Sequence, residues 1–400
     1  MSMLQKIIHF SICLIVLSLP LYLIRLRIGW IPTNLLELMI GGLFIIWLVS
    51  RIRINSSQLK KVNFFFPVFL IFLGVTLATL FSVDTITSAG IWKSWFIIPL
   101  IFFIIIISYL KSKERVRDIL FALFLSGTGV ALVAFFYWLN NNLTYDGRLR
   151  AFYLSPNHLA MYLSPILILS FYLYPFFKKK ISRILLFTAD CLLFTVIYLT
   201  YSYGAWLGIG GALIFVLIIF FKSRTPENKR HFFYLTSFFI LLVVFSFVWQ
   251  IPSQKFQGFL DFSYPSWQSR LIIWQSAGTI IKDHSLIGIG PGMFQEYYLD
   301  YQTKLPPYLE WSVPQPHNLF LAFWLQTGLL GLIGFIWLLF KFFGSVIPKQ
   351  TPKKLSFILI AAMIYILIHG LVDTTYWKND LSIIFWLLIG MASNQFTRLK

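Results

Sequence analysis

Charged side chains are scarce in this sequence. Asp, Glu, Lys and Arg together make up 12% of its 400 residues, whereas apolar residues make up 58% and aromatic residues 19%. Soluble domains carry about a quarter charged residues, so this composition excludes an ordinary soluble protein. Apolar runs of roughly 17 to 25 residues, each long enough to cross a bilayer, fill most of the chain. The sequence therefore predicts a polytopic membrane protein.

Cysteine is nearly absent as well. The two cysteines, Cys13 and Cys191, both fall inside apolar spans. A thiol packed among apolar side chains is favoured there over a disulfide or a metal ligand. The sequence also contains no HExxH, no paired-acid metal motif, no nucleophile elbow and no Walker sequence. We therefore expect no metal and no cofactor.

Hydropathy and its breaks divide the chain into apolar spans, which predict an all-α fold forming a single membrane domain over residues 1–400. The first span has the apolar core of a signal peptide, but no small-x-small cleavage site follows it. We interpret it as a retained first helix. The twelve expected spans lie near residues 7–24, 34–50, 64–82, 91–110, 118–139, 158–176, 183–201, 204–222, 232–250, 317–343, 355–374 and 381–396.

Positive charge is distributed unevenly around these spans. Twenty-three of the 33 Lys and Arg residues lie near the termini or in alternate loops. Short cytoplasmic loops carry an excess of Lys and Arg, so these loops and both termini are predicted to be cytoplasmic. Topology and anionic membrane lipids explain the net charge of +19, and no nucleic-acid binding is expected. The basic runs are RIRINSSQLKK, KSKERVR, KKKISR, KSRTPENKR and PKQTPKK.

The longest connection, residues 251–316, falls on the outer side. It contains the stretch SWQSRLIIWQSAGTIIKDH, whose apolar residues recur at helical spacing and predict a helix near the membrane surface. Ten cations lie on or near this outer face, against the topology rule. They are Arg25, Arg27, Lys93, Arg148, Arg150, Lys255, Arg270, Lys282, Lys304 and Lys378.

Two of these arginines precede a helix start in GRLRAFYLSPNHLAM. Ser155 or Asn157 is expected to cap the helix that begins near Pro156. Two interpretations of Arg148 and Arg150 stay open. They are interfacial arginines beside a capped helix, or they form an anion site in which guanidinium groups and the positive end of a helix meet phosphate.

Arg270 and Trp274 are spaced i, i+4, so a helix would place them on one face. An ordinary amphipathic helix with a polar anchor is the alternative. The glycine-rich run HSLIGIGPGMF follows, in which Gly290 and Gly292 permit close backbone approach. Because the run departs from GxGxxG and Pro291 lacks an amide proton, a tight turn is favoured over a phosphate loop.

A histidine and an asparagine precede the tenth span in PQPHNLFLAFW. The prolines end any preceding helix, so His317 and Asn318 lie near the first turn of that span, on the outer side. His317 is either a capped polar contact or a group that transfers protons near neutral pH.

Four polar residues inside spans require interior partners. Gln326 lies deeper in the tenth span, and Asp190 lies inside the seventh with no partner identifiable from the sequence. His369 and Asp373 are spaced i, i+4 and could hydrogen-bond as a pair.

The run from Arg270 to Trp274, followed by HSLIGIGPGMF and PHNLFLAFWLQTGLLGL, resembles the O-antigen ligase and O-antigen polymerase superfamily, which includes O-linking oligosaccharyltransferases. The resemblance covers roughly Ala151 to Asp373. It implies transfer of a preassembled glycan from undecaprenyl diphosphate to a hydroxyl acceptor, either the lipid A-core oligosaccharide or a growing glycan. The reaction would invert the anomeric carbon without a metal, on the periplasmic face of the bacterial cytoplasmic (inner) membrane.

The resemblance also implies roles for individual residues. Arg270 would hold the diphosphate, and His317 would act as the base or orient the acceptor hydroxyl. The GRLRAFYLSPN run resembles the family's Arg-x-x-Gly-x-x-x-x-x-Asn stretch, which places Arg148 or Arg150 and Asn157 nearby. The residues implied to position the site are Trp274, Gly290, Gly292 and Asn318.

One departure concerns the leaving diphosphate. Many members carry Ser-Arg-Gly after the seventh span, whereas this chain has YSYGAWLG, so Tyr203 stands in the place of the arginine. Tyrosine can donate one hydrogen bond but brings no charge. Either Arg148 or Arg150 then supplies the second cation, or the donor headgroup differs.

These features favour ligation of O-antigen to a lipopolysaccharide core, with polymerisation of the repeat units as the alternative. The length of the chain and its single large loop favour the ligase. A transporter or flippase of lipid-linked sugars would also need cations. It is less favoured because the polar groups cluster at one face and no paired interrupted spans occur.

Overall fold

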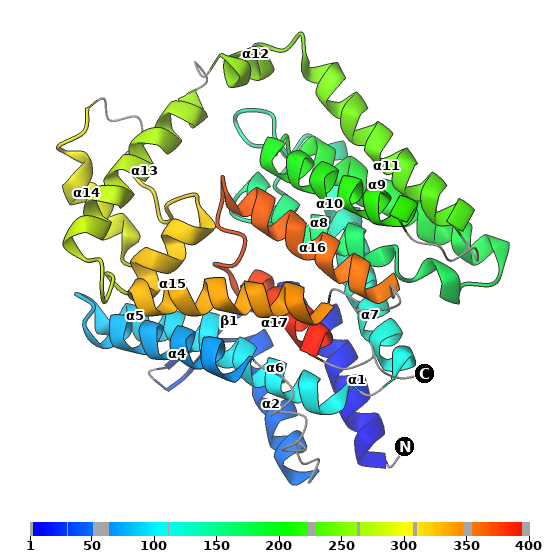
Figure 1. The fold of residues 1–400 in the computed structure, drawn as a ribbon, viewed down its shortest axis with the longest axis horizontal. Helices are drawn as coiled ribbons and strands as arrows, with labels where there is room; N and C mark the ends of the chain where they lie inside the picture. The colour runs from blue at the N-terminus through cyan, green and yellow to red at the C-terminus, as the bar shows by residue number, and fades with distance from the viewer. Residues whose placement is uncertain are drawn as a thin grey trace.

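The protein is mostly helical (Figure 1). The computed structural model describes residues 3–29, 31–50, 64–110, 112–222, 229–261, 265–306, 310–346 and 354–393. Most of three basic runs that entered the topology prediction, at 51–61, 223–228 and 347–353, lies outside the described residues, as do residues 394–400.

The first half of the chain contains a departure from the all-α prediction. The first span was expected to reach residue 24, but its helix ends at Leu17 because Pro20 follows. The chain then forms a small antiparallel hairpin whose turn begins at Gly29, at a φ of +59°. The elements are α1 (Met3–Leu17), η1 (Leu19–Leu23), β1 (Arg25–Ile28), β2 (Ile31–Asn34), α2 (Leu35–Val49), α4 (Phe65–Leu80), α5 (Thr85–Trp92), η2 (Lys93–Ile97), α6 (Ile98–Tyr109) and α7 (Lys113–Leu139).

The second half is helical throughout its described elements. The described residues of 251–316 form three helices, one of which, α13, covers the predicted amphipathic stretch. The elements are α8 (Pro156–Ser170), η3 (Tyr174–Phe176), α9 (Lys180–Leu199), α10 (Tyr203–Lys222), α11 (Lys229–Gln250), α12 (Gln254–Leu260), α13 (Pro265–Asp283), α14 (Phe294–Gln302), α15 (Leu319–Val346), α16 (Lys354–Gly370) and α17 (Asn379–Ser393).

Every expected span overlaps one of these helices. Over the described residues, five helices are long and apolar enough to cross a bilayer, and shorter apolar helices accompany them. This supports a membrane protein, while the number of twelve crossings stays a prediction. Nearly all residues of α8 and α17 are buried, which explains why most of their residues are apolar.

The connection between α11 and α15 packs as a small unit of its own. In Figure 1, α12 links α11 to α13, and α13 and α14 lie together beside the start of α15. Ile273, Ala277 and Ile280 on α13 pack against Phe294 and Tyr298 on α14. The predicted helix is confirmed, while its position at the membrane surface stays a prediction.

The helix α15 is broken at Gly328, which has a φ of +68° and a ψ of −177°. The glycine-rich turn after α13 fills the break, because Ile289 N donates to Leu325 O at 2.7 Å and Leu329 N donates to Leu286 O at 3.0 Å. A Cβ at Gly328 would lie 2.5 Å from the oxygen of Leu286. The tight turn is confirmed, and only glycine fits this backbone approach.

Two buried polar residues have the partners that their burial requires. Gln326 accepts a hydrogen bond from Gly292 N at 2.9 Å and donates one to Gln315 at 2.8 Å. Asp190 accepts hydroxyl hydrogen bonds from Ser170 and Tyr174, each at 2.7 Å. Cys13 and Cys191 are free thiols.

Candidate active site

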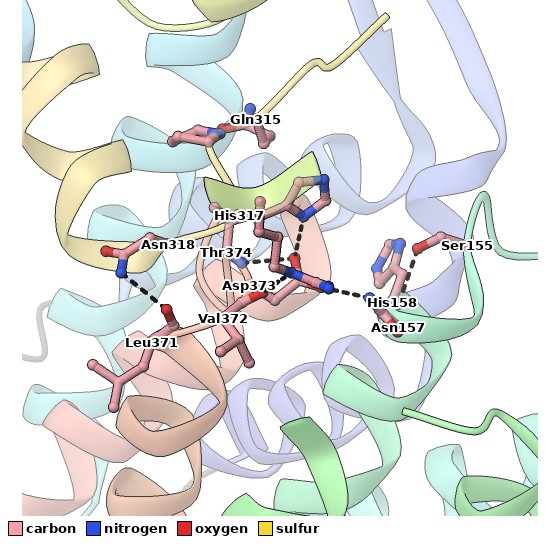
Figure 2. Close-up of polar contacts among 12 residues, drawn as sticks. Ser155, Asn157, His158, Gln315, His317, Asn318, Leu371, Val372, Asp373 and Thr374 are labelled. Carbon is pink, nitrogen blue, oxygen red and sulfur yellow. Dashed lines mark hydrogen bonds and ion pairs between the residues drawn. The ribbon is translucent and has the colours of Figure 1, made fainter. Parts of the chain in front are cut away.

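Several of the predicted outer-face residues meet where helices begin or end. Asn157 is in the first turn of α8, His317 precedes α15, and Asp373 follows α16. The helix α13 brings Arg270 to the same place, where its Nε donates to Val372 O at 3.0 Å. Figure 2 shows the side chains of His317, Asp373 and Asn157 converging at this point.

The centre of the site is a pair formed by His317 and Asp373. His317 Nδ1 lies 3.3 Å from Asp373 Oδ1, and the side chains are 29% and 5% exposed. Asp373 Oδ1 also accepts from Thr374 N at 2.8 Å, and Oδ2 accepts from Asn157 Nδ2 at 2.7 Å. Each oxygen of the carboxyl group therefore has a donor.

Asp373 is held as a carboxylate. Burial raises the pKa of Asp373, but the hydrogen bond from His317 and the charges of His317, His369 and Arg270 hold it well below its ordinary value. A carboxylate only accepts hydrogen bonds, so His317 Nδ1 must carry the hydrogen between them. In the neutral ring, the lone pair is then on Nε2, which can accept a proton.

The backbone of His317 is strained. Its φ is +46°, in the left-handed region that residues with a Cβ rarely occupy. Trp274 Nε1 donates to Pro316 O at 3.1 Å and approaches His317 O at 3.4 Å. Asn318 caps α15 through Phe320 N at 3.0 Å and donates to Leu371 O at 2.9 Å. Trp274 and Asn318 thus hold the segment that presents the imidazole, and such strain is often found at functional sites.

A second arginine, Arg148, is connected to Asp373 through the side chain of Asn157. Arg148 Nη2 donates to Asn157 Oδ1 at 2.6 Å, and Asn157 in turn donates to Asp373. Arg148 Nε donates to Thr200 O at 2.7 Å, at the end of α9. Ser155 is the residue that caps α8, through His158 N, so the amide of Asn157 is available to form this bridge.

A third cation, Lys255 of α12, lies close to Arg148. Its Nζ is 4.0 Å from Asp146 Oδ2 and 5.6 Å from the centre of the Tyr201 ring, while Asp146 is 3.9 Å from Arg148 Nε. Burial first, and then the charge of Arg148, lowers the pKa of Lys255 to about 8. The sequence placed Lys255 on the outer face but gave no reason to include it in the site.

The structure does not bring all predicted residues to His317. A Cβ at Gly290 would lie 2.7 Å from Ser82, and one at Gly292 would lie 2.4 Å from Ile91. These glycines therefore allow the turn to pack against α4 and α5. An effect of either glycine on His317 would be transmitted through α15.

Two further predicted residues have other surroundings. The ring of Tyr203 packs against Trp206 at 5.3 Å and Phe256 at 5.8 Å, within an aromatic group. Arg150 is exposed, and its carbonyl oxygen accepts from Tyr153 N at 3.1 Å. Of the two arginines that the sequence offered, Arg148 is the one that is connected to Asp373.

The suggested pair of His369 and Asp373 is wrong. His369 Nδ1 lies 2.8 Å from the hydroxyl of Tyr365, whereas Asp373 bonds to His317 and Asn157. The helix α16 ends at Gly370, so the i, i+4 geometry of a helix does not extend to residue 373.

One buried polar pair near the site was missed. His158 Nε2 lies 3.1 and 3.2 Å from the two oxygens of Asp380, and the side chains are 2% and 0% exposed. The rings of Tyr153 and His158 are tilted by 49° to one another, with their centres 4.4 Å apart. An acid at the start of the last span, together with a histidine beside Asn157, was the available signal.

The fold and the site define a helical membrane protein with a His–Asp pair and several cations gathered at one end of its helices. A family model described as O-antigen ligase matches residues 188–336. This confirms the resemblance over that segment, which is similar to a family whose members are ligases or polymerases of the glycosyltransferase kind. The matched segment contains Arg270 and His317 but not Arg148, Asn157 or Asp373. No curated protein matches the chain.

Proposed function

We propose that this enzyme transfers a preassembled glycan from undecaprenyl diphosphate to a hydroxyl group of an acceptor. The observation that carries the proposal is the His317–Asp373 pair, with Arg270 beside it and Arg148 joined to it through Asn157. In this arrangement, His317 can accept a proton, and the two arginines can neutralise a leaving anion. A glycosyl transfer from a diphosphate carrier needs both functions.

His317 serves as the base in this proposal. Nε2 accepts the proton of the acceptor hydroxyl while that oxygen attacks the anomeric carbon from the face opposite the diphosphate. The bond between the anomeric carbon and the diphosphate oxygen breaks, and its electron pair leaves with undecaprenyl diphosphate. Asp373 stabilises the imidazolium through Nδ1–H and keeps the ring in its productive tautomer. The anomeric configuration is inverted, and the proton passes from His317 to water.

Fixed cations stabilise the leaving diphosphate. Arg270 and Arg148 carry charges that are always present, and their held positions need no reorganisation as charge develops. Lys255 lies near Arg148 and supplies a further charge that Tyr203 does not. We therefore assign the missing charge to Arg148 and Lys255 rather than to the exposed Arg150.

The site is proposed to face the periplasm of the bacterial inner membrane, with both termini cytoplasmic. Three helices support this orientation because each begins with a lysine: α7 with Lys113, α9 with Lys180 and α16 with Lys354. The helix α9 ends beside Thr200, and α16 ends just before Asp373, so these lysines lie at the ends away from the site. An excess of cations marks the cytoplasmic side.

We favour ligation to the lipid A-core oligosaccharide over polymerisation, with a transporter or flippase third. The break in α15 is occupied by main-chain hydrogen bonds from the glycine turn, which speaks against a substrate path through it. The proposed partners are the undecaprenyl diphosphate donor, the acceptor glycan and membrane lipids.

Deleting the gene and sizing the glycan on the carrier and on the acceptor separates these functions. A ligase leaves long chains stranded on the carrier and a bare acceptor. A polymerase leaves single repeats on the acceptor and no long chains anywhere. Unchanged glycan on both would contradict a transferase of either kind.

A further inference from the structure

A cavity of about 740 Å³ lies at the opposite end of the bundle from His317. It is lined by residues that follow α8, by residues of α11 and by the first turns of α9 and α16, including Phe171, Lys180 and Lys354. The other end of α8 carries Asn157, and the other end of α16 lies just before Asp373. At 1.5 Å per residue, these helices separate the cavity from the site by roughly 20 Å.

One part of the cavity wall is strongly basic. Lys178, Lys180, Arg183 and Lys354 all line it, and no Asp or Glu is among its described lining residues. Arg183 is anchored, because its Nε donates to Phe177 O at 2.7 Å. Four cations around one cavity favour an anionic ligand.

The rest of the wall is apolar and reaches the surface of the protein. Ile184, Phe187 and Phe238 line it, and the two aromatic rings lie 5.2 Å apart. Ile184 is 47% exposed and Phe238 is 38% exposed. In a helical bundle that spans a membrane, such a surface faces the acyl chains of the bilayer.

We propose that this cavity binds an anionic glycerophospholipid, with its phosphate at the four cations and its acyl chains along Ile184, Phe187 and Phe238. The volume suits a headgroup and the upper part of the chains. A free phosphate would leave the apolar wall without a partner, and a zwitterionic lipid would leave the cations uncompensated. Basic pockets between membrane helices bind anionic headgroups for this reason. The bound lipid joins α9, α11 and α16.

The test uses the purified full-length protein in detergent, titrated with dioleoyl phosphatidylglycerol and followed by native mass spectrometry. Dioleoyl phosphatidylcholine and inorganic phosphate serve as competing probes. We expect the anionic lipid to bind at least tenfold more tightly than phosphatidylcholine and to resist displacement by phosphate. Equal binding of the two lipids, or displacement by inorganic phosphate, would overturn the proposal.

Two double variants, each of which removes two positive charges, test whether the lipid binds at this cavity. Each lysine contributes roughly fivefold to the binding of an anionic headgroup, so Lys178→Gln with Lys180→Gln should weaken binding about 30-fold. The control, Lys179→Gln with Lys341→Gln, removes the same charge from the same end of the protein, at residues that do not line the cavity. An equal loss in both variants, or none in the first, contradicts a site at this cavity.

Discussion

Replacing Asp373 with Asn tests whether the carboxylate sets the state of His317. The Asn amide keeps the size of the side chain and an oxygen acceptor for Asn157 but loses the charge. Its NH2 group can donate to His317 Nδ1, which moves the ring hydrogen to Nε2. The proposed base then has no lone pair facing the acceptor.

The size of the effect follows from the contacts. One charge-assisted hydrogen bond at 3.3 Å is lost from the imidazolium, which contributes about 1.5 to 3 kcal/mol, or about 10- to 150-fold in rate. The unfavourable tautomer adds to this, and loss of an orienting carboxylate elsewhere lowers kcat by as much as about 10⁴-fold. We therefore expect Asp373→Asn to lower the transfer rate by about 10² to 10⁴.

The assay is single-turnover release of undecaprenyl diphosphate from a labelled donor, with the donor Kd measured in parallel. Donor binding should change by less than about threefold, because both arginines remain. The control is Asp283→Asn on α13, where the carboxylate accepts from the hydroxyl of Tyr301 at 2.6 Å, away from His317. A rate for Asp373→Asn within threefold of the wild type would refute the reasoning.

Three further predictions follow from other contacts. The pKa of Lys255 is lowered to about 8, so its ammonium group loses its proton as the pH rises through that value. Donor affinity, measured as Kd against pH, should therefore fall above pH 8. Lys255→Arg stays charged and should abolish this fall. Gly328→Ala should destabilise the protein by about 1 to 3 kcal/mol or more in thermal unfolding, whereas Gly344→Ala, in the open part of the same helix, should not. Because Asn157 helps to position Arg148 through their 2.6 Å hydrogen bond, the rate losses of Arg148→Ala and Asn157→Ala should be less than additive in the double variant, and fully additive losses would contradict this coupling.

Much of the fold could be predicted from local patterns. Apolar length placed a helix at every expected span, and helical spacing placed α13, because both depend on neighbouring residues. The hairpin formed by β1 and β2 was missed because its strands are short and lie within an otherwise apolar region. Its position follows from Pro20, which ends the first helix early.

The site was only partly predictable. The histidine–asparagine motif and the i, i+4 spacing of Arg270 and Trp274 are visible in the sequence. The partner of His317 is not, because Asp373 lies 56 residues away and follows a helix end that hydropathy placed too late. Lys255 was likewise visible only as one outer cation, since its approach to Arg148 depends on how α12 packs.

The most direct test of the central claim compares wild type with His317→Ala in reconstituted membranes containing an undecaprenyl diphosphate-linked glycan and the lipid A-core acceptor. We predict that the wild type forms glycosylated acceptor and releases undecaprenyl diphosphate in equal amounts. His317→Ala should bind the donor with nearly unchanged Kd and form neither product. Transfer by His317→Ala at the rate of the wild type would contradict the assignment of His317 as the base.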